Sequence, residues 1–209
     1  MKKAVIFDMD GVLIDSEYAY FLRRMKFFDS IGIEPGTRNF TDFIGLSDSM
    51  IWEKLITDDK NKRERLREEY KKYREINRIN FKKVMNKSVK YIIKSLRDKN
   101  IKVAIASSSE KKEILRMMNE CEITEYIDFV ISGEECTESK PNPEIYIKSI
   151  EALNILPKEA LAIEDSTLGI ASAVSAGLEV LGVKQKDYDL DQSKATYTIS
   201  DLDEIIKYL

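Results

Sequence analysis

Short, mainly apolar runs recur along the chain, and each run ends at polar residues or at glycine. Runs of this length are typical of strands that are buried on both faces of a parallel sheet. The runs are Ala4–Phe7, Val103–Ala106, Phe129–Ile131, Ala160–Ile163, Val180–Val183 and Tyr197–Ile199. We therefore expect these segments to form a sheet, with the last of them as an edge strand.

In most of the stretches between these runs, apolar residues recur at the spacing of one helix face. In Lys87–Lys99, for example, Val89, Ile92 and Leu96 fall on one face of a helix. The same spacing predicts further helices over Glu110–Cys121, Pro143–Leu153 and Thr167–Ala176. Strands that alternate with helices predict an α/β fold built on a doubly wound parallel sheet.

One long stretch, from Asp15 to about Lys83, interrupts this alternation because its pattern is helical throughout. The helices expected there are Tyr18–Ile31, which ends at Gly32, Ser47–Ile56 and Lys60–Lys83. The last of these carries a narrow apolar stripe on a highly charged helix, which is typical of a solvated amphipathic helix. We therefore expect a helical domain over residues 15–83, inserted into a core made of residues 1–14 and 84–209.

The composition narrows the chemistry that is open to this protein. The chain has 209 residues, of which 43% are hydrophobic and 34% charged, so a packed core is expected. It contains no histidine, which excludes histidine-based triads, general bases and metal sites. Cys121 and Cys136 form no metal-binding spacing and are expected to be ordinary reduced thiols. Catalysis must therefore use carboxylates, lysine, the hydroxyl groups of serine or tyrosine, cysteine, or a metal ion held by oxygen.

Charge and hydropathy also limit the expected partners. The net charge of −3 gives no reason to expect nucleic acid as a partner. The first apolar run, Ala4–Phe7, is far too short for a signal peptide or a membrane span. We therefore expect a cytoplasmic protein with no membrane partner, and a monomer is the default oligomeric state.

Two pairs of carboxylates follow predicted strands and indicate a metal site. Asp8 and Asp10 follow the first strand, and Glu164 and Asp165 follow the fourth. Carboxylates at the end of a buried strand are costly unless a cation compensates them, and oxygen ligands favour Mg²⁺. The alternatives at the first pair are a loop turn or a helix-capping device, and the alternative at the second is capping of the next helix by Asp165 or Ser166.

Two further segments indicate binding of an anion. Lys140 lies in a stretch stiffened by two prolines, and a lysine ammonium suits a phosphate group. Ser107, Ser108 and Ser109 lie between a strand and a helix, where hydroxyl and backbone N–H groups favour anions. The alternatives are a surface lysine and capping of the helix by Ser109. Ligands of open α/β sheets bind at the carboxyl ends of the strands, where all these segments fall.

These residues, taken together, resemble the motifs of the haloacid dehalogenase superfamily, and the resemblance covers nearly the whole chain. The matching segments are Asp8-Met-Asp-Gly-Val, Ile105-Ala-Ser107, Ser139-Lys140-Pro-Asn-Pro and Ile163-Glu164-Asp165-Ser166. The resemblance is closest to the subgroup of β-phosphoglucomutase and related sugar-phosphate phosphatases. It implies a Rossmann-like core with a helical cap domain inserted after the first strand.

The resemblance implies a role for each carboxylate. Asp8 is similar to the nucleophile that becomes an aspartyl phosphate. Asp10 would be the general acid and then the general base, and its backbone carbonyl would bind Mg²⁺. Asp165 would be a metal ligand, and Glu164 a metal ligand or a partner of the ligands.

The resemblance also implies that Ser107, Ser108 and Lys140 hold the transferring phosphate. Asp10 favours phosphoryl transfer over cleavage of a carbon–halogen bond, because the true dehalogenases of the superfamily lack it. β-Phosphoglucomutases carry a histidine near the position of Tyr20, and an arginine for a second phosphate where this chain has Asp48.

A Mg²⁺-dependent phosphatase of small phosphate monoesters, with sugar phosphates first, is therefore the expected function. A phosphosugar mutase is the alternative. A non-catalytic binding protein is disfavoured because the nucleophile, lysine and metal-binding positions are all kept. A dinucleotide-binding protein is disfavoured because the first loop, Asp8-Met-Asp-Gly, lacks the Gly-x-Gly-x-x-Gly pattern.

Overall fold

The computed structural model describes residues 1–209, which form two compact units. One unit consists of Met1–Asp15 and Phe81–Leu209, and we refer to it as the core unit. The other consists of Ser16–Asn80, and we refer to it as the cap unit. No helix in either unit is both long enough and apolar enough to cross a bilayer.

The core unit is built on one six-stranded sheet in which every pairing is parallel. The strands are β1 (Ala4–Phe7), β2 (Lys102–Ser107), β3 (Phe129–Ser132), β4 (Ala160–Glu164), β5 (Glu179–Val183) and β6 (Tyr197–Ile199). Their order is β3-β2-β1-β4-β5-β6. The chain therefore adds strands outward from β1 to β3 on one side, returns to the other side of β1 with β4, and continues outward to β6. The expected doubly wound parallel sheet, with its last strand at one edge, is confirmed.

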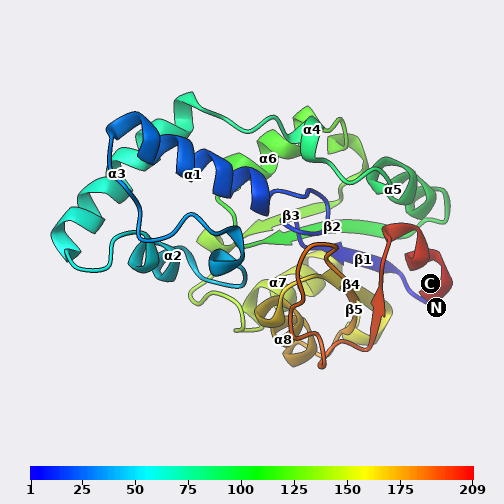
Figure 1. The fold of residues 1–209 in the computed structure, drawn as a ribbon. Coiled ribbons are helices and arrows are strands. Elements are labelled where there is room, and N and C mark those ends of the chain that lie inside the picture. Colours follow the sequence, from blue (N-terminus) through cyan, green and yellow to red (C-terminus); the bar gives the residue numbers. More distant parts are fainter. The chain divides into compact units, whose positions relative to one another are not determined.

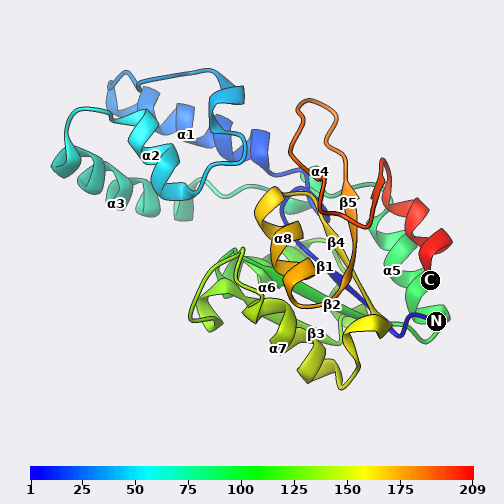
Figure 2. The ribbon, with the colours of Figure 1, turned by 90° about the horizontal axis from the view of Figure 1, so that it is seen from below.

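Helices cover both faces of this sheet (Figures 1 and 2), with α7 and α8 on one face and α5 and α6 on the other. The helices of the core unit are α4 (Phe81–Val84), α5 (Val89–Asp98), α6 (Lys111–Glu120), α7 (Glu144–Leu153) and α8 (Thr167–Ser175). Short 3-10 turns occupy Thr124–Tyr126, Gly133–Glu135, Pro157–Glu159 and Leu202–Tyr208. Alternate residues of β1, such as Ala4 and Ile6, pack with the apolar faces of α7 and α8.

The cap unit is helical and has a hydrophobic cluster of its own. It comprises α1 (Glu17–Ile31), a 3-10 turn (Phe40–Phe43), α2 (Asp48–Leu55) and α3 (Lys60–Ile76) (Figure 1). Aromatic residues dominate the cluster, and the Tyr70 ring packs edge-on against both Phe27 and Trp52. Gly32 ends α1 in the left-handed region (φ 65°), as its position in the sequence predicts.

The prediction of a single helix over Lys60–Lys83 is wrong, because α3 ends at Ile76 and α4 is a separate helix. The side-chain amide and the backbone N–H of Asn77 both donate to the carbonyl of Tyr73, which closes the helix there. Asparagine competes for backbone hydrogen bonds in this way and favours helix ends. Phe81 is then fully buried in the core unit, where its ring lies 4.0 Å from the Arg116 guanidinium.

Candidate active site

The loop that follows β1 places Asp8 at the carboxyl end of a central strand. The backbone N–H of Asp8 donates to the carbonyl of Ile163 on β4, which continues the pairing of the two strands. The chain then turns at Gly11, which has a φ of 78°. A Cβ atom on Gly11 would lie 2.0 Å from Oδ2 of Asp165, so only glycine fits here. The sequence thus packs its first motif directly against its last.

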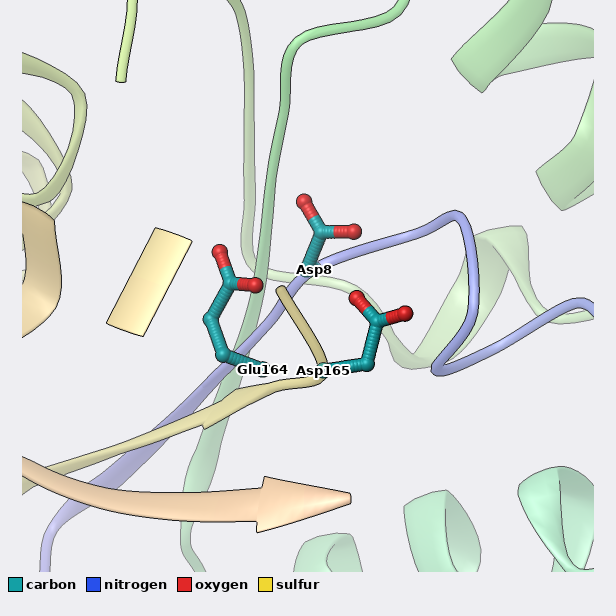
Figure 3. Close-up of side chains that lie close together, drawn as sticks. All are labelled: Asp8, Glu164 and Asp165. Carbon is teal, nitrogen blue, oxygen red and sulfur yellow. The ribbon is translucent and has the colours of Figure 1, made fainter. Parts of the chain in front are cut away.

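Three carboxylates converge at the ends of β1 and β4 (Figure 3). One oxygen from each of Asp8, Glu164 and Asp165 lies within 4.8 Å of the others, and all three residues are buried. Lys140 joins them, because its Nζ lies 2.6 Å from Asp8 Oδ1 and 2.6 Å from Glu164 Oε1. Three carboxylates and one ammonium leave a net charge of about −2 in a buried space, which is costly without further compensation.

The pKa of Asp8 is raised, which means that its charged form lacks sufficient stabilisation by positive charge. This pKa is raised to about 8, chiefly by burial; Lys140 lowers it, and the carboxylates of Glu164 and Asp10 add to the rise. Burial lowers the pKa of Lys140, but Asp8 and Glu164 outweigh burial and raise it overall, so its ammonium stays charged. A divalent cation held by oxygen would neutralise the cluster and ionise Asp8. The donor set contains only oxygen, which fits Mg²⁺.

Glu164 is tied to protein donors on both of its oxygens. Its Oε1 accepts from Lys140 and from the Tyr146 hydroxyl (2.7 Å), and its Oε2 accepts from Ser166 (3.3 Å). A Cβ on Gly169 would lie 2.1 Å from the Glu164 carboxyl group, so α8 approaches this side chain closely. Burial and the charge of Glu164 raise the pKa of Tyr146, so the hydroxyl keeps its proton and donates.

The helical spacing over Pro143–Leu153 places Tyr146 on the apolar face of that helix and predicts no further role for it. A tyrosine on such a face needs a partner for its hydroxyl when it is buried, and that was the signal available.

Two glutamines after β5 also reach the site, and no pattern in the sequence predicted either of them. Gln185 Nε2 donates to the carbonyl of Gly11 (2.7 Å) and to Asp165 Oδ2 (3.1 Å). Gln192 Nε2 donates to the backbone carbonyls of Asp165 (2.7 Å) and Val183 (2.8 Å). Gln185 therefore holds the Asp165 side chain, whereas Gln192 holds only its backbone.

The serines after β2 divide their roles. Ser107 is buried and its hydroxyl oxygen accepts from the N–H of Ser109, while Ser108 is exposed. The Ser109 hydroxyl donates to Asp10 Oδ2 at 2.7 Å. Ser109 does not cap the following helix, so that alternative is wrong. Glu110 is the N-cap residue of α6.

Ser166 does cap its helix, because its hydroxyl oxygen accepts from the N–H of Gly169 at 3.0 Å. The capping alternative is thus confirmed for Ser166, whereas the carboxylate of Asp165 belongs to the acidic cluster.

Comparison with known proteins identifies the family of this chain. A family model described as haloacid dehalogenase-like hydrolase matches residues 5–183. The chain belongs to this family. The match spans every motif residue named above, from Asp8 to Asp165, so the hydrolase family and its parallel-sheet core are established together.

Within the haloacid dehalogenase-like hydrolases, relatives bear the names of phosphatases and mutases. A phosphorylated carbohydrates phosphatase of Thermotoga maritima is 32% identical over 186 residues, which is 85% of this chain and 82% of the relative. A phosphoglycolate phosphatase of Aquifex aeolicus is 25% identical over 99% of this chain and 96% of its own length. The crystal structure of a β-phosphoglucomutase from Clostridium difficile is 27% identical, with a TM-score of 0.76 over 100% of this chain and 95% of its own.

Proposed function

We propose that this protein is a Mg²⁺-dependent phosphatase that transfers the phosphoryl group of a small phosphate monoester to Asp8 and then to water. One observation carries this proposal. Asp8 lies at the end of a central strand, 2.6 Å from a charged lysine and beside two further buried carboxylates. A carboxylate nucleophile needs both kinds of neighbour, since it must approach a phosphate that is itself negative.

The residues that would hold Mg²⁺ are the carboxylates of Asp8 and Asp165 and the backbone carbonyl of Asp10. The ion, when bound, offsets the repulsion between the nucleophile and the phosphate dianion. Glu164 was expected to be either a ligand or a partner of the ligands. Its hydrogen bonds to Lys140 and Tyr146 favour the second role, in which it fixes the lysine ammonium beside Asp8.

The chemistry proceeds in two displacements at phosphorus. An oxygen of Asp8 forms a bond to phosphorus while the ester P–O bond breaks, and the leaving oxygen takes a proton from Asp10. Asp10 then removes a proton from water, which attacks phosphorus and releases phosphate and the free Asp8 carboxylate. Ser109 holds the Asp10 carboxylate through its hydroxyl, and Ser107, Ser108 and Lys140 hold the phosphoryl oxygens.

The substrate class is a small phosphorylated metabolite, with sugar phosphates first. The relative named for phosphorylated carbohydrates supports this choice. The likeness to a β-phosphoglucomutase structure supports a phosphosugar mutase as the second candidate. Tyr20 and Asp48 stand where the mutases carry a histidine and an arginine, which favours hydrolysis over a bisphosphorylated intermediate.

Two assays on the purified full-length chain test the proposal. We expect p-nitrophenyl phosphate to be hydrolysed, with activity lost in EDTA and restored by Mg²⁺. A panel of phosphorylated metabolites then separates the candidates, because a phosphatase releases inorganic phosphate whereas a mutase converts β-glucose 1-phosphate to glucose 6-phosphate. Asp8→Asn should remove either activity and leave the fold intact. Full activity of Asp8→Asn, or activity that persists in chelator, would contradict the site.

A further inference from the structure

Protein donors already occupy part of the acidic cluster formed by Asp8, Glu164 and Asp165. Lys140 Nζ lies 2.6 Å from Asp8 Oδ1, and Gln185 Nε2 donates to Asp165 Oδ2 at 3.1 Å. Glu164 accepts hydrogen bonds on both of its oxygens. Each of the three carboxyl groups drawn in Figure 3 therefore has at least one oxygen bound to another part of the protein.

The number of oxygens that a carboxylate offers affects which cation suits it. Ca²⁺ takes about six to eight oxygen ligands in a flexible arrangement and can bind both oxygens of one carboxylate, whereas Mg²⁺ requires a near-ideal octahedron and keeps several waters. An ion that bound both oxygens of Asp165 would have to lie beside the amide protons of Gln185 or displace them. The hydrogen bond to Oδ2 therefore disfavours the larger ion.

Gln185 differs from the other donors in what it touches. Its amide makes two hydrogen bonds, to Asp165 Oδ2 and to the carbonyl of Gly11 (2.7 Å). Neither acceptor is the proposed nucleophile or a proposed phosphate ligand. Replacement of Lys140, by contrast, would disturb phosphate binding as well as the metal centre. Gln185 is thus the donor through which metal choice can be changed with the least effect on the other parts of the site.

The amide of Gln185 also joins two loops that would supply metal ligands. A Cβ on Gly11 would lie 2.0 Å from Asp165 Oδ2, so the turn after β1 packs directly against this carboxyl group. The amide bridges the same turn and the same oxygen. The backbone carbonyl of Asp10, which is a proposed ligand, comes immediately before Gly11 in the chain. The bridge therefore restricts the spacing between two proposed ligands, and a restricted spacing favours an ion of one size.

The segment between β5 and β6 that carries this amide is held at several other points. Gln192 Nε2 donates to the backbone carbonyls of Asp165 (2.7 Å) and Val183 (2.8 Å). The Thr167 hydroxyl donates to the carbonyl of Asp191 at 2.8 Å. The loss of one side-chain amide should therefore leave the path of this segment in place.

We propose that Gln185 determines the metal specificity of the site and makes it select Mg²⁺ over Ca²⁺. The amide engages one oxygen of Asp165, so that the carboxylate binds the ion through its other oxygen. It also restricts the distance between that carboxylate and the carbonyl of Asp10. Selectivity between these two ions depends on cavity size, ligand number and flexibility. The inference rests on the proposed function, because the ion that it concerns is the Mg²⁺ proposed there.

Calorimetric titration of the metal-free, full-length protein with Mg²⁺, and separately with Ca²⁺, measures the preference as Kd for Ca²⁺ divided by Kd for Mg²⁺. We expect the wild type to prefer Mg²⁺. Gln185→Leu removes the donor and should lower this preference by about tenfold or more, because partners of metal ligands are worth roughly 10–100-fold in affinity. Gln185→Glu removes the donor and adds a carboxylate oxygen, so it should lower the preference further.

Gln192→Leu is the matched control, because Gln192 holds the same segment but reaches only the backbone of Asp165. Its preference for Mg²⁺ should equal that of the wild type, and circular dichroism checks the fold of each variant. A merely structural role of Gln185 would weaken the binding of both ions alike. An unchanged preference in Gln185→Leu and Gln185→Glu, or an equal fall in Gln192→Leu, would overturn the inference.

The results also distinguish a failure of this inference from a failure of the proposed function. A wild type that binds neither ion would overturn both. A wild type that prefers Ca²⁺, but loses phosphatase activity in EDTA and regains it with Mg²⁺, would overturn the role of Gln185 alone. The same holds if the wild type prefers Mg²⁺ and both Gln185 variants keep that preference.

Discussion

Replacement of Gln185 by leucine should weaken Mg²⁺ binding. Gln185 Nε2 makes two hydrogen bonds, to Asp165 Oδ2 and to the carbonyl of Gly11, and leucine keeps the size but neither donor. Asp165 is only 6% exposed, so water cannot readily replace the lost donor. The bond to the carboxylate is worth about 1.5–3 kcal/mol, and the bond to the carbonyl about 1 kcal/mol.

Gln185→Leu should lower both the affinity for Mg²⁺ and the free energy of unfolding, and the two can be measured separately. Without Gln185, the Asp165 side chain can leave the rotamer in which it faces Asp8 and Glu164. Changes of this kind beside a metal ligand cost roughly tenfold to a hundredfold in metal affinity. Titration calorimetry of the metal-free protein with Mg²⁺ measures that loss, and urea unfolding without metal measures the change in stability.

Gln192→Leu is the matched control. Gln192 also donates to Asp165, but to its backbone carbonyl, and its second bond is to Val183. We expect this variant to lose stability while it keeps an Mg²⁺ affinity close to that of the wild type. Equal Mg²⁺ affinity in Gln185→Leu and the wild type, or an equal loss in both variants, would refute the role given to the Gln185 side chain.

Three other changes test neighbouring parts of the site. Tyr146→Phe removes the hydroxyl that donates to Glu164, and it should lower the free energy of unfolding by about 1.5–3 kcal/mol in urea, since the acceptor is charged and buried. Gly11→Ala places a methyl group 2.0 Å from Asp165 Oδ2 at a φ of 78°, and it should abolish phosphatase activity. Burial raises the pKa of Asp8 to about 8, so the folded metal-free protein binds a proton that the unfolded chain releases near its ordinary pKa. Stability without metal should therefore fall as the pH rises toward about 8, and the increase in Tm that Mg²⁺ causes should grow over the same range.

Each of these three predictions has a control variant or a result that would contradict it. Gly32→Ala is matched to Gly11→Ala, because Gly32 has a φ of 65° but open space around the position of the added Cβ. It should cost stability without loss of activity, and similar activity in the two glycine variants would contradict the contact with Asp165. An unfolding free energy of Tyr146→Phe equal to the wild-type value would show that the hydroxyl is not needed. An Mg²⁺ effect on Tm that shrinks as the pH rises would contradict the raised pKa of Asp8.

Most of the residues that the sequence predicted lie at the carboxyl end of a strand or just beyond it. Asp8 directly follows β1, Ser107 is the last residue of β2, and Asp165 directly follows β4. Parallel strands bring these carboxyl ends to one edge of the sheet. Periodicity and topology were therefore enough to predict that Asp8 and Asp165 lie close together. The same logic predicted all six strands, because a buried parallel strand is apolar on both faces.

The residues that the sequence did not predict act through contacts that no local pattern records. Gln185 lies in a polar segment after β5, and only the folded chain brings it to Gly11, which is 174 positions away. Ser109 fits a helix cap as well as it fits a partner for Asp10, and tertiary structure decided for Asp10. The break after Ile76 was missed because the charged pattern of α3 continues past it. In the cap unit, Asp48 was read as a lost arginine, whereas Arg24 and Arg67 lie beside it.

The central claim is that a carboxylate oxygen of Asp8 is the nucleophile that attacks phosphorus. A crystal structure with Mg²⁺ and beryllofluoride tests this claim most directly. Beryllofluoride binds to a carboxylate oxygen as a mimic of a phosphoryl group. We expect beryllium bonded to an oxygen of Asp8, with Lys140 in contact with the fluorides. Beryllium bonded to Asp10 or Glu164, or no adduct in a preparation that hydrolyses phosphate esters, would contradict the assignment of Asp8.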